Sequence, residues 1–234
     1  MFTDFDFDVI QRALPYMGQG MLFTLGLTFL AMIGGIVIGT LLALMRLSHF
    51  RLLNVPAGGY VNLLRSTPLI LVIFWFYFLV PIAIKKISGD AYAEGLGPFH
   101  SALIAFTMFE AAYYCEIIRA GIQSVPRGQV QAAYALGLTY RLAMMKVVLP
   151  QAFRNMVPVL LTQGIILFQD TSLVYVVGLT DFMGAASKVA QRDGRLVEMY
   201  LFAALVYFVL CFAASHAVKL LQARYNVGRH GSAP

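Results

Sequence analysis

Long apolar stretches run along the chain and predict helices that span a membrane. A spanning helix needs about 20 mostly apolar residues. Five stretches meet this requirement, and they cover residues 21–45, 66–84, 98–118, 156–180 and 199–218. No stretch alternates apolar and polar residues with a period of two, so strands are not expected. The predicted fold class is therefore all-α, a polytopic membrane bundle of five transmembrane helices.

Composition supports the membrane prediction and excludes soluble, disordered and fibrous proteins. Hydrophobic residues make up 60% of the 234 residues and charged residues 12%. Soluble domains carry about 25% charged residues, and so apolar a chain cannot cover a compact core with polar surface. Cys115 and Cys211 are too few for a disulfide framework and too far apart for a zinc pattern. We expect no metal site and no resident cofactor.

The distribution of lysine and arginine predicts how the spans are oriented. Eleven of the 17 bases, Arg65 among them, would lie on one side of the five spans and six on the other. Bases favour the cytoplasmic side, so the N-terminus is expected in the periplasm and the C-terminus in the cytoplasm. Three aspartates precede the first base, which does not suit a cleavable signal peptide. Residues 1–19 are therefore expected to form a periplasmic segment, and residues 222–234 a cytoplasmic tail.

The polar loop between the third and fourth spans, residues 119–155, is predicted to form two short helices at the cytoplasmic membrane face. Ser124, Val125 and Pro126 give a helix-start signal. Good helix formers follow over residues 129–138 and reach Gly137, a plausible C-terminal stop. A second helical stretch over residues 141–149 is expected to stop at Pro150.

Small residues follow a defined spacing in this loop. Gln131-Ala132-Ala133 precedes Gly137 by three residues, and nine further residues lead to Val147-x-Leu149-Pro150. From the residues alone, this small-residue face either packs on its own bundle or lets another protein approach closely. The full spacing resembles the EAA motif of binding-protein-dependent ABC importer permeases, with Gln in place of Glu and Val in place of Ile. The resemblance implies a coupling helix that docks into a cytoplasmic ATPase. Its expected coupling residues are Gln131, Ala132, Ala133, Gly137, Leu138 and Pro150.

The resemblance covers residues 20–221, which are expected to form an ABC transmembrane type-1 permease domain. Arg65-Ser66-Thr67-Pro68-Leu69 and Asp170-Thr171-Ser172-Leu173 are similar to the polar-amino-acid branch of the family. The runs 109–129 and 168–170 look most like the permease subunits of glutamate/aspartate importers. The resemblance implies an inner-membrane importer with a cytoplasmic ABC ATPase dimer, a sister permease subunit and a periplasmic amino-acid-binding protein.

The chain is not expected to be an enzyme. It contains no GxxxxGK[ST] phosphate loop, so ATP and Mg²⁺ would be bound by the separate ATPase. A membrane-embedded enzyme such as an aspartyl protease would need two facing aspartates, whereas only Asp170 lies in a predicted span. A secondary transporter would usually be larger and built from repeats. A permease for another polar amino acid, such as glutamine, stays open as an alternative.

Ionisable residues inside spans are rare and mark candidate functional positions. Asp170 is either a pathway or gate residue or a structural carboxylate tied to a neighbour such as Arg65. Gln163 lies two helical turns earlier on the same face, and is either a pathway residue or a polar contact between helices. Relatives that resemble basic-amino-acid importers have Glu here, so a neutral amide suits an acidic cargo. Hydroxyls nearby are expected to supply donors. The candidate pathway residues are Arg65, Thr67, Thr162, Gln163, Asp170, Thr171 and Ser172.

Three further features involve charged or small residues in or near the spans. Arg65, at the expected cytoplasmic mouth of the second span, is either a snorkelling anchor or a partner for Asp170 or a substrate carboxylate. Glu110 is expected to pair with Arg119 or with a sister subunit, so both are candidate interface residues. Gly35 and Gly39 have the GxxxG spacing that brings membrane helices close together.

Overall fold

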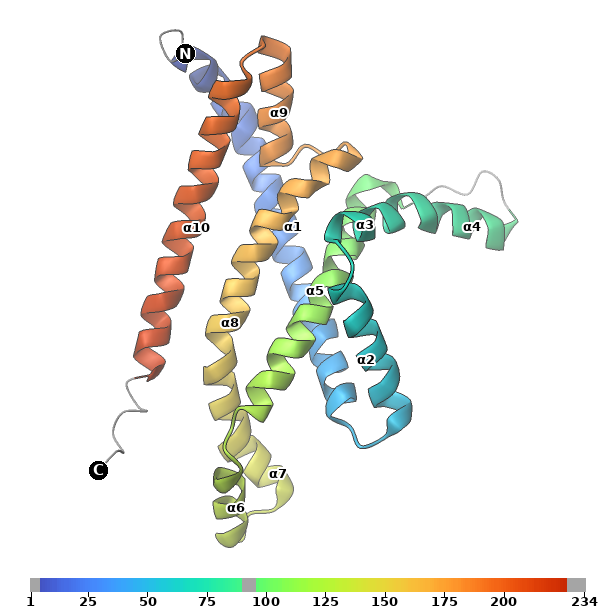
Figure 1. The fold of residues 1–234 in the computed structure, drawn as a ribbon, viewed down its shortest axis with the longest axis vertical. Helices are drawn as coiled ribbons and strands as arrows, with labels where there is room; N and C mark the ends of the chain where they lie inside the picture. The colour runs from blue at the N-terminus through green and yellow to red at the C-terminus, as the bar shows by residue number, and fades with distance from the viewer. Residues whose placement is uncertain (1–4, 90–95, 227–234) are drawn as a thin grey trace.

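The computed structural model describes residues 5–89 and 96–226, and every regular element in them is a helix (Figure 1). The elements in chain order are α1 (Phe7–Leu47), α2 (Arg51–Arg65), α3 (Leu69–Phe74), η1 (Trp75–Leu79), α4 (Val80–Ser88), α5 (Gly97–Gln123), α6 (Arg127–Ala135), α7 (Tyr140–Ala143), η2 (Met144–Val148), α8 (Leu149–Asp170), η3 (Thr171–Val177), α9 (Phe182–Asp193) and α10 (Leu196–Asn226).

Five helical runs in the described residues are long and apolar enough to cross a membrane, which confirms the predicted fold class. These runs are Phe7–Leu47, Leu69–Ile87, Gly97–Gln123, Tyr140–Val177 and Leu196–Arg224. The bundle is elongated, with α9 at one end and α6 and α7 at the other (Figure 1). We call these the α9 end and the α6 end.

Helices α1 and α5 form the central contact of the bundle. At Gly39, a side-chain Cβ would lie 2.8 Å from Cβ of Tyr114 and 2.9 Å from the carbonyl oxygen of Ala111. At Gly35, it would lie 3.0 Å from Cβ of Glu110. These distances leave no room for any larger residue, so the predicted GxxxG pair brings α1 directly against α5.

Helix α1 begins at Phe7 rather than at residue 21, where the apolar stretch starts. Its first turns bury Val9, Ala13 and Met17 against Phe182 of α9 and Met199 of α10. The Asp6 carboxylate accepts a hydrogen bond from the backbone N–H of Asp8 and caps the helix. Packing against the C-terminal helices thus extends α1 through the segment predicted to precede the membrane. The domain boundaries at residues 19/20 and 221/222 stay predictions.

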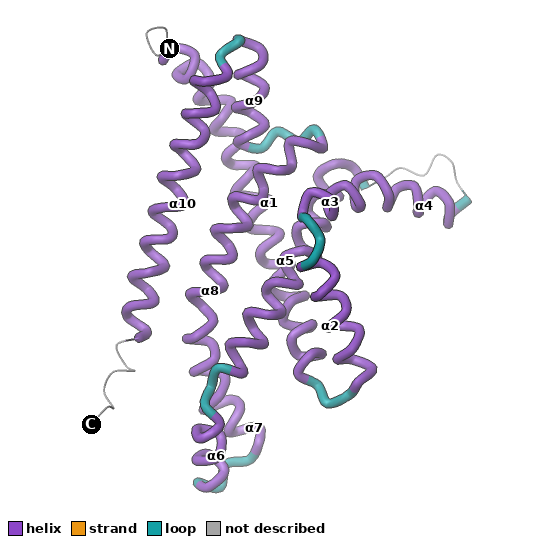
Figure 2. Tube along the Cα trace, viewed as in Figure 1, coloured by secondary structure: helices purple, strands orange, loops and turns teal. Residues whose placement is uncertain are grey.

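Helix α2 carries Arg65 at its C-terminal end. This 15-residue helix rises about 22 Å at the usual 1.5 Å per residue. Figure 2 shows the loop that follows it, residues 66–68, at mid-height beside α5. The next helical run that is long and apolar enough to cross a membrane starts at Leu69, so the place of Arg65 at the cytoplasmic mouth stays a prediction. The sequence did not predict α2, because this helix buries only a narrow apolar stripe, Ala57, Val61 and Leu64, and so does not resemble a membrane segment.

Candidate functional site

A buried polar contact links α5 to α8 in the middle of the bundle. Glu110 is completely buried, and Gln163 is 9% exposed. Nε2 of Gln163 donates a hydrogen bond to Oε1 of Glu110 over 3.2 Å. Of the two interpretations of Gln163, the structure supports a polar contact between helices.

The predicted pairing of Glu110 with Arg119 is wrong. Arg119 pairs with Glu116 one turn earlier on α5, at 2.6 Å, and donates to Oε1 of Gln123 at 2.7 Å. Arg46, in the last turn of α1, forms an ion pair with the same Glu116 carboxylate. Glu110 is enclosed by its own chain, which also contradicts the expected interface role. Arg119 is nine residues from Glu110 on the same helix, which is too far for a contact. Glu116 and Arg119 have the favourable i, i+3 spacing instead.

A second set of polar residues, Arg65, Tyr113 and Asp170, is partly exposed at the surface of the chain. The guanidinium of Arg65 lies over the ring of Tyr113, 5.5 Å from its centroid. Tyr113 is also within electrostatic range of Glu110 and Asp170. Arg65 is exposed and Asp170 is partly exposed. Arg65 of α2 and Asp170 of α8 are thus both within electrostatic range of Tyr113 on α5, although Arg65 and Asp170, both described, form no ion pair with each other.

Asp170 is the last residue of α8, and the chain continues as the 3₁₀ segment η3. The predicted position of Asp170 inside the fourth span agrees with the helical run Tyr140–Val177, whereas the change from α8 to η3 directly after it was not predicted. A negative charge at a helix C-terminus is unfavourable because the helix dipole is negative there. Such a local conflict is common at functional positions.

The hydroxyls expected to serve as donors are mostly already bonded. Thr67 donates to the carbonyl oxygen of Leu63 at 2.8 Å. Thr162 donates to that of Pro158 at 2.9 Å, and Thr171 to that of Phe168 at 2.7 Å. Each hydroxyl hydrogen is donated to a carbonyl oxygen three or four residues earlier in the chain, so these threonines offer acceptor lone pairs rather than donors. Ser172 is partly exposed beside them.

The α6 end carries the predicted coupling segment, and Gly137 has a specific role in it. Its φ is +78°, a left-handed conformation, and a Cβ would meet nothing within 4 Å. The Gly137 N–H bonds to the carbonyl of Tyr134 at 2.9 Å, and the Leu138 N–H to that of Ala133 at 3.1 Å. This is the Schellman arrangement that ends a helix at a glycine. Gly137 is therefore required for its backbone conformation, and the expected close approach of a partner stays a prediction.

The side chains of this segment divide into an inner and an outer set. Ala133 is buried within the chain, and α6 packs against η2. For this alanine, the interpretation that the small-residue face packs on its own bundle therefore holds. Gln131 and Ala132 are exposed, and Leu136 has 82% of its surface exposed. Leu136 was not among the expected coupling residues, although the sequence shows this apolar residue directly before the stop glycine.

Pro150 does not end a helix, contrary to prediction. The π-helical turn η2 precedes α8, and Pro150 occupies the first turn of α8. A proline in the first turn of a helix costs no hydrogen bond, because its missing N–H would have no partner there. The chain therefore runs without a break from the second short helix into the fourth span.

The α9 end is tied together by buried and exposed carboxylates. Asp181 is fully buried and caps α9, accepting hydrogen bonds from the N–H groups of Met183 and Gly184 at 3.0 and 2.9 Å. Burial raises the pKa of Asp181 to about 6. Thr24 of α1 accepts the N–H of Phe182 at 3.0 Å. An aspartate directly before a helix is a recognisable cap signal, so this anchor was visible in the sequence.

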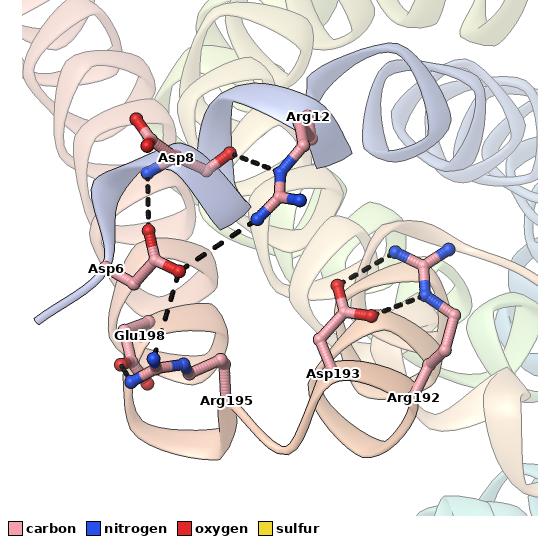
Figure 3. A network of polar contacts seen from close by, with 7 residues as sticks. All are labelled: Asp6, Asp8, Arg12, Arg192, Asp193, Arg195 and Glu198. Carbon is pink, nitrogen blue, oxygen red and sulfur yellow. Dashed lines mark hydrogen bonds and ion pairs between the residues drawn. The ribbon is translucent and has the colours of Figure 1, made fainter.

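A surface network completes this end (Figure 3). Asp6 lies 4.0 Å from Arg12 and 3.9 Å from Arg195, which in turn contacts Glu198 at 3.1 Å. These contacts join the start of α1 to the start of α10. Arg192 and Asp193 form a separate exposed pair at 2.7 Å.

Comparison with known proteins adds independent findings. Residues 35–227 match the family described as "Binding-protein-dependent transport system inner membrane component". The chain is 52% identical to the glutamate/aspartate import permease protein GltK of Escherichia coli O157:H7, over 94% of this chain and 98% of that protein. It is 34% identical to the L-cystine transport system permease protein TcyB of Bacillus subtilis (strain 168), over 96% and 93% of the two chains. A crystal structure of an amino acid ABC transporter with histidines superposes with a TM-score of 0.85 at 32% identity, covering 94% of this chain and 98% of that one.

Proposed function

This chain belongs to the family of binding-protein-dependent transport system inner membrane components, and from that membership we propose that it carries glutamate and aspartate. It is a multi-pass inner-membrane permease subunit of an ABC importer for amino acids, and a separate subunit hydrolyses the ATP. The 52% identity to GltK over nearly the whole chain carries the choice of substrate. The L-cystine permease TcyB is less similar, at 34% identity.

The family implies two partners, an ABC ATPase and a periplasmic binding protein. A sister permease subunit is the third partner in our proposal. Arg65, the last residue of α2, is exposed, and the loop that follows it lies at mid-height of the bundle (Figure 2). Asp170 is partly exposed. Charged side chains facing hydrocarbon are costly, so such residues normally face protein or a water-filled path. A sister subunit packed over the α2–α5 side would shield both charges and enclose a path between the two chains.

The substrate would pass between Arg65 and Asp170. A dicarboxylic amino acid carries two carboxylates and one ammonium group at neutral pH. A guanidinium forms strong, paired hydrogen bonds with a carboxylate, and Asp170 offers a negative partner for the ammonium group. Thr67 and Ser172 lie on the same two segments and provide hydroxyl oxygens. In this proposal, Gln163 and Glu110 hold α8 against α5 and do not contact the substrate.

The α6 end would face the cytoplasm and dock on the ATPase. Eleven bases are assigned to this side, Arg229 outside the described residues included, against six on the other. The exposed Gln131, Ala132 and Leu136 would form the docking surface, with Gly137 ending the helix behind them. ATP and Mg²⁺ would bind to the ATPase alone. The N-terminus would then lie in the periplasm.

Uptake in proteoliposomes tests the substrate. The permease is reconstituted with its ATPase and binding protein, and radiolabelled glutamate uptake is measured with unlabelled competitors. Aspartate should compete strongly, and glutamine, cystine and arginine weakly. Competition by glutamine with none by aspartate would overturn the assignment.

A pair of arginine variants tests the pathway. Arg65→Ala should lower glutamate uptake by about tenfold or more, the factor that corresponds to 1.4 kcal/mol. Arg51→Ala is the matched control, because Arg51 is an exposed arginine at the other end of the same helix. Equal uptake in the two variants would remove Arg65 from the path while leaving the substrate assignment intact.

A further inference from the structure

An apolar groove opens where α1, α8 and α10 meet. Its volume is about 370 Å³. Leu25 and Met32 of α1, Gly164 and Ile165 of α8, and Cys211 and Ala214 of α10 contribute to its lining. Gly164 helps to open it, since a Cβ there would lie 3.2 Å from the sulfur of Met32. The groove is thus built by three helices that are far apart in the sequence.

The lining contains no charged side chain. The hydroxyl of Thr28, which also lines the groove, donates to the carbonyl oxygen of Thr24 at 2.8 Å and is occupied. A polar ligand entering here would lose its bonds to water and gain none in return, which is unfavourable. Only hydrocarbon suits such a surface.

The position of the groove identifies the source of that hydrocarbon. All of its lining residues lie inside the three runs Phe7–Leu47, Tyr140–Val177 and Leu196–Arg224, each able to cross a membrane. Figure 1 shows α10 and α2 on opposite sides of the bundle, with α1, α5 and α8 between them. The charged residue Arg65, which needs protein or water beside it, lies on α2. The α10 side carries the apolar groove instead, the kind of surface that lipid chains cover.

We propose that this groove binds one acyl chain of a membrane lipid. Its volume is at the lower end of the roughly 300–1,000 Å³ typical of small-molecule sites. It therefore accommodates part of a single chain, and the headgroup stays outside at the membrane surface. The chain fills the space between α8 and α10 and connects them through dispersion contacts. The proposal depends on the membrane-spanning helices and not on which amino acid is carried.

Photolabelling of the reconstituted importer tests the site. The probe is a phosphatidylethanolamine with a diazirine in the middle of one acyl chain. In the wild-type protein, labelled peptides should come from the groove segments of α8 and α10. Ala214→Phe fills the groove and should reduce labelling of these peptides by about tenfold.

Ala213→Phe is the matched control, because Ala213 is the adjacent exposed residue of α10 and does not line the groove. It should leave labelling within about twofold of wild type. Equal labelling of the two variants would overturn the proposal. If Ala214→Phe fails to fold, the map of labelled peptides in the wild-type protein decides instead, and labels spread evenly over lipid-facing helices would overturn it.

A helix from another permease chain is the alternative occupant. A cysteine introduced by Ala214→Cys reports on it, because Ala214 is exposed and lines the groove, whereas Cys115 and Cys211 are both buried. A bifunctional maleimide that links two permease chains through position 214, together with an absence of lipid label in the groove, would replace the lipid by a protein partner and overturn the proposal. Labelled groove peptides without a cross-link through position 214 support it.

Discussion

Nε2 of Gln163 lies 3.2 Å from Oε1 of Glu110, and this hydrogen bond joins α8 to α5 in the membrane-spanning bundle. The other carboxylate oxygen, Oε2 of Glu110, is buried without a hydrogen-bond partner among the described residues. A buried carboxylate with a single donor depends strongly on that donor, because leaving it unpaired costs the full desolvation penalty. The contact therefore requires one acceptor and one donor, whichever helix supplies each.

Gln163→Glu should strongly reduce glutamate uptake. Two carboxylates about 4 Å apart repel by roughly 4 kcal/mol at an effective dielectric constant of 20. Either α8 and α5 would then separate, or one of the two carboxylates would take up a proton. Gln163→Asn keeps the amide on a shorter side chain and should have a smaller effect. Radiolabelled glutamate uptake at equal expression measures both.

An exchange variant separates this explanation from a direct effect on the cargo. Combining Glu110→Gln with Gln163→Glu restores one carboxylate and one amide at the contact, and most of the uptake should return. If position 163 acts by repelling an acidic substrate, the exchange variant will stay as inactive as the single one.

Gly137 should tolerate asparagine better than valine. Its φ of +78° lies in the left-handed region, where a non-glycine residue costs about 1–2 kcal/mol and asparagine less than β-branched residues. Valine would distort the end of α6, and with it the surface formed by Leu136. Substrate-stimulated ATPase activity of the assembled importer should follow the order glycine, asparagine, valine. Equal activity of the asparagine and valine variants would show that the backbone conformation is unimportant.

Glu116→Gln should destabilise the bundle more than an exposed substitution does. Glu116 pairs with both Arg46 and Arg119, and its side chain is only 17% exposed. Removing the charge leaves two partly buried guanidinium groups uncompensated, at a cost of about 1–3 kcal/mol.

Asp193→Asn provides the control, since Asp193 pairs with Arg192 at the surface. Exposed pairs contribute about 0–1 kcal/mol. Thermal unfolding in nanodiscs compares the two, and similar losses would contradict a structural role for the three-residue cluster.

The number and approximate position of the spans could be predicted because they depend on apolar length alone. The GxxxG pair Gly35 and Gly39 was also recognisable, since close helix packing depends on local sequence spacing. The short helix α6 was predicted for the same reason: its start and stop signals lie close together in the sequence. Features encoded over a short stretch were therefore accessible from the sequence.

Long-range contacts were not accessible. Glu110 and Gln163 are 53 positions apart, and nothing in either segment specifies the other as its partner. The place of Arg65 in the bundle depends on how α2 packs against α1 and α5, which its mixed composition conceals. Gly137 was recognised as a helix stop, and the structure adds its positive φ, a property of the backbone that a residue name only permits.

Asp181 should make the stability of the protein depend on pH between about 4 and 6. Burial raises its pKa to about 6, whereas an unfolded aspartate has a pKa of about 4. The folded state therefore binds this proton more tightly, so the contribution is fully present below pH 4, is lost as the pH rises to about 6, and stays lost above. Two pKa units correspond to at most roughly 3 kcal/mol. Asp181→Asn retains an oxygen that can cap α9 but cannot ionise, so its unfolding temperature should fall less between pH 4 and 6. Parallel curves for wild type and variant in nanodiscs would exclude Asp181 as the titrating group.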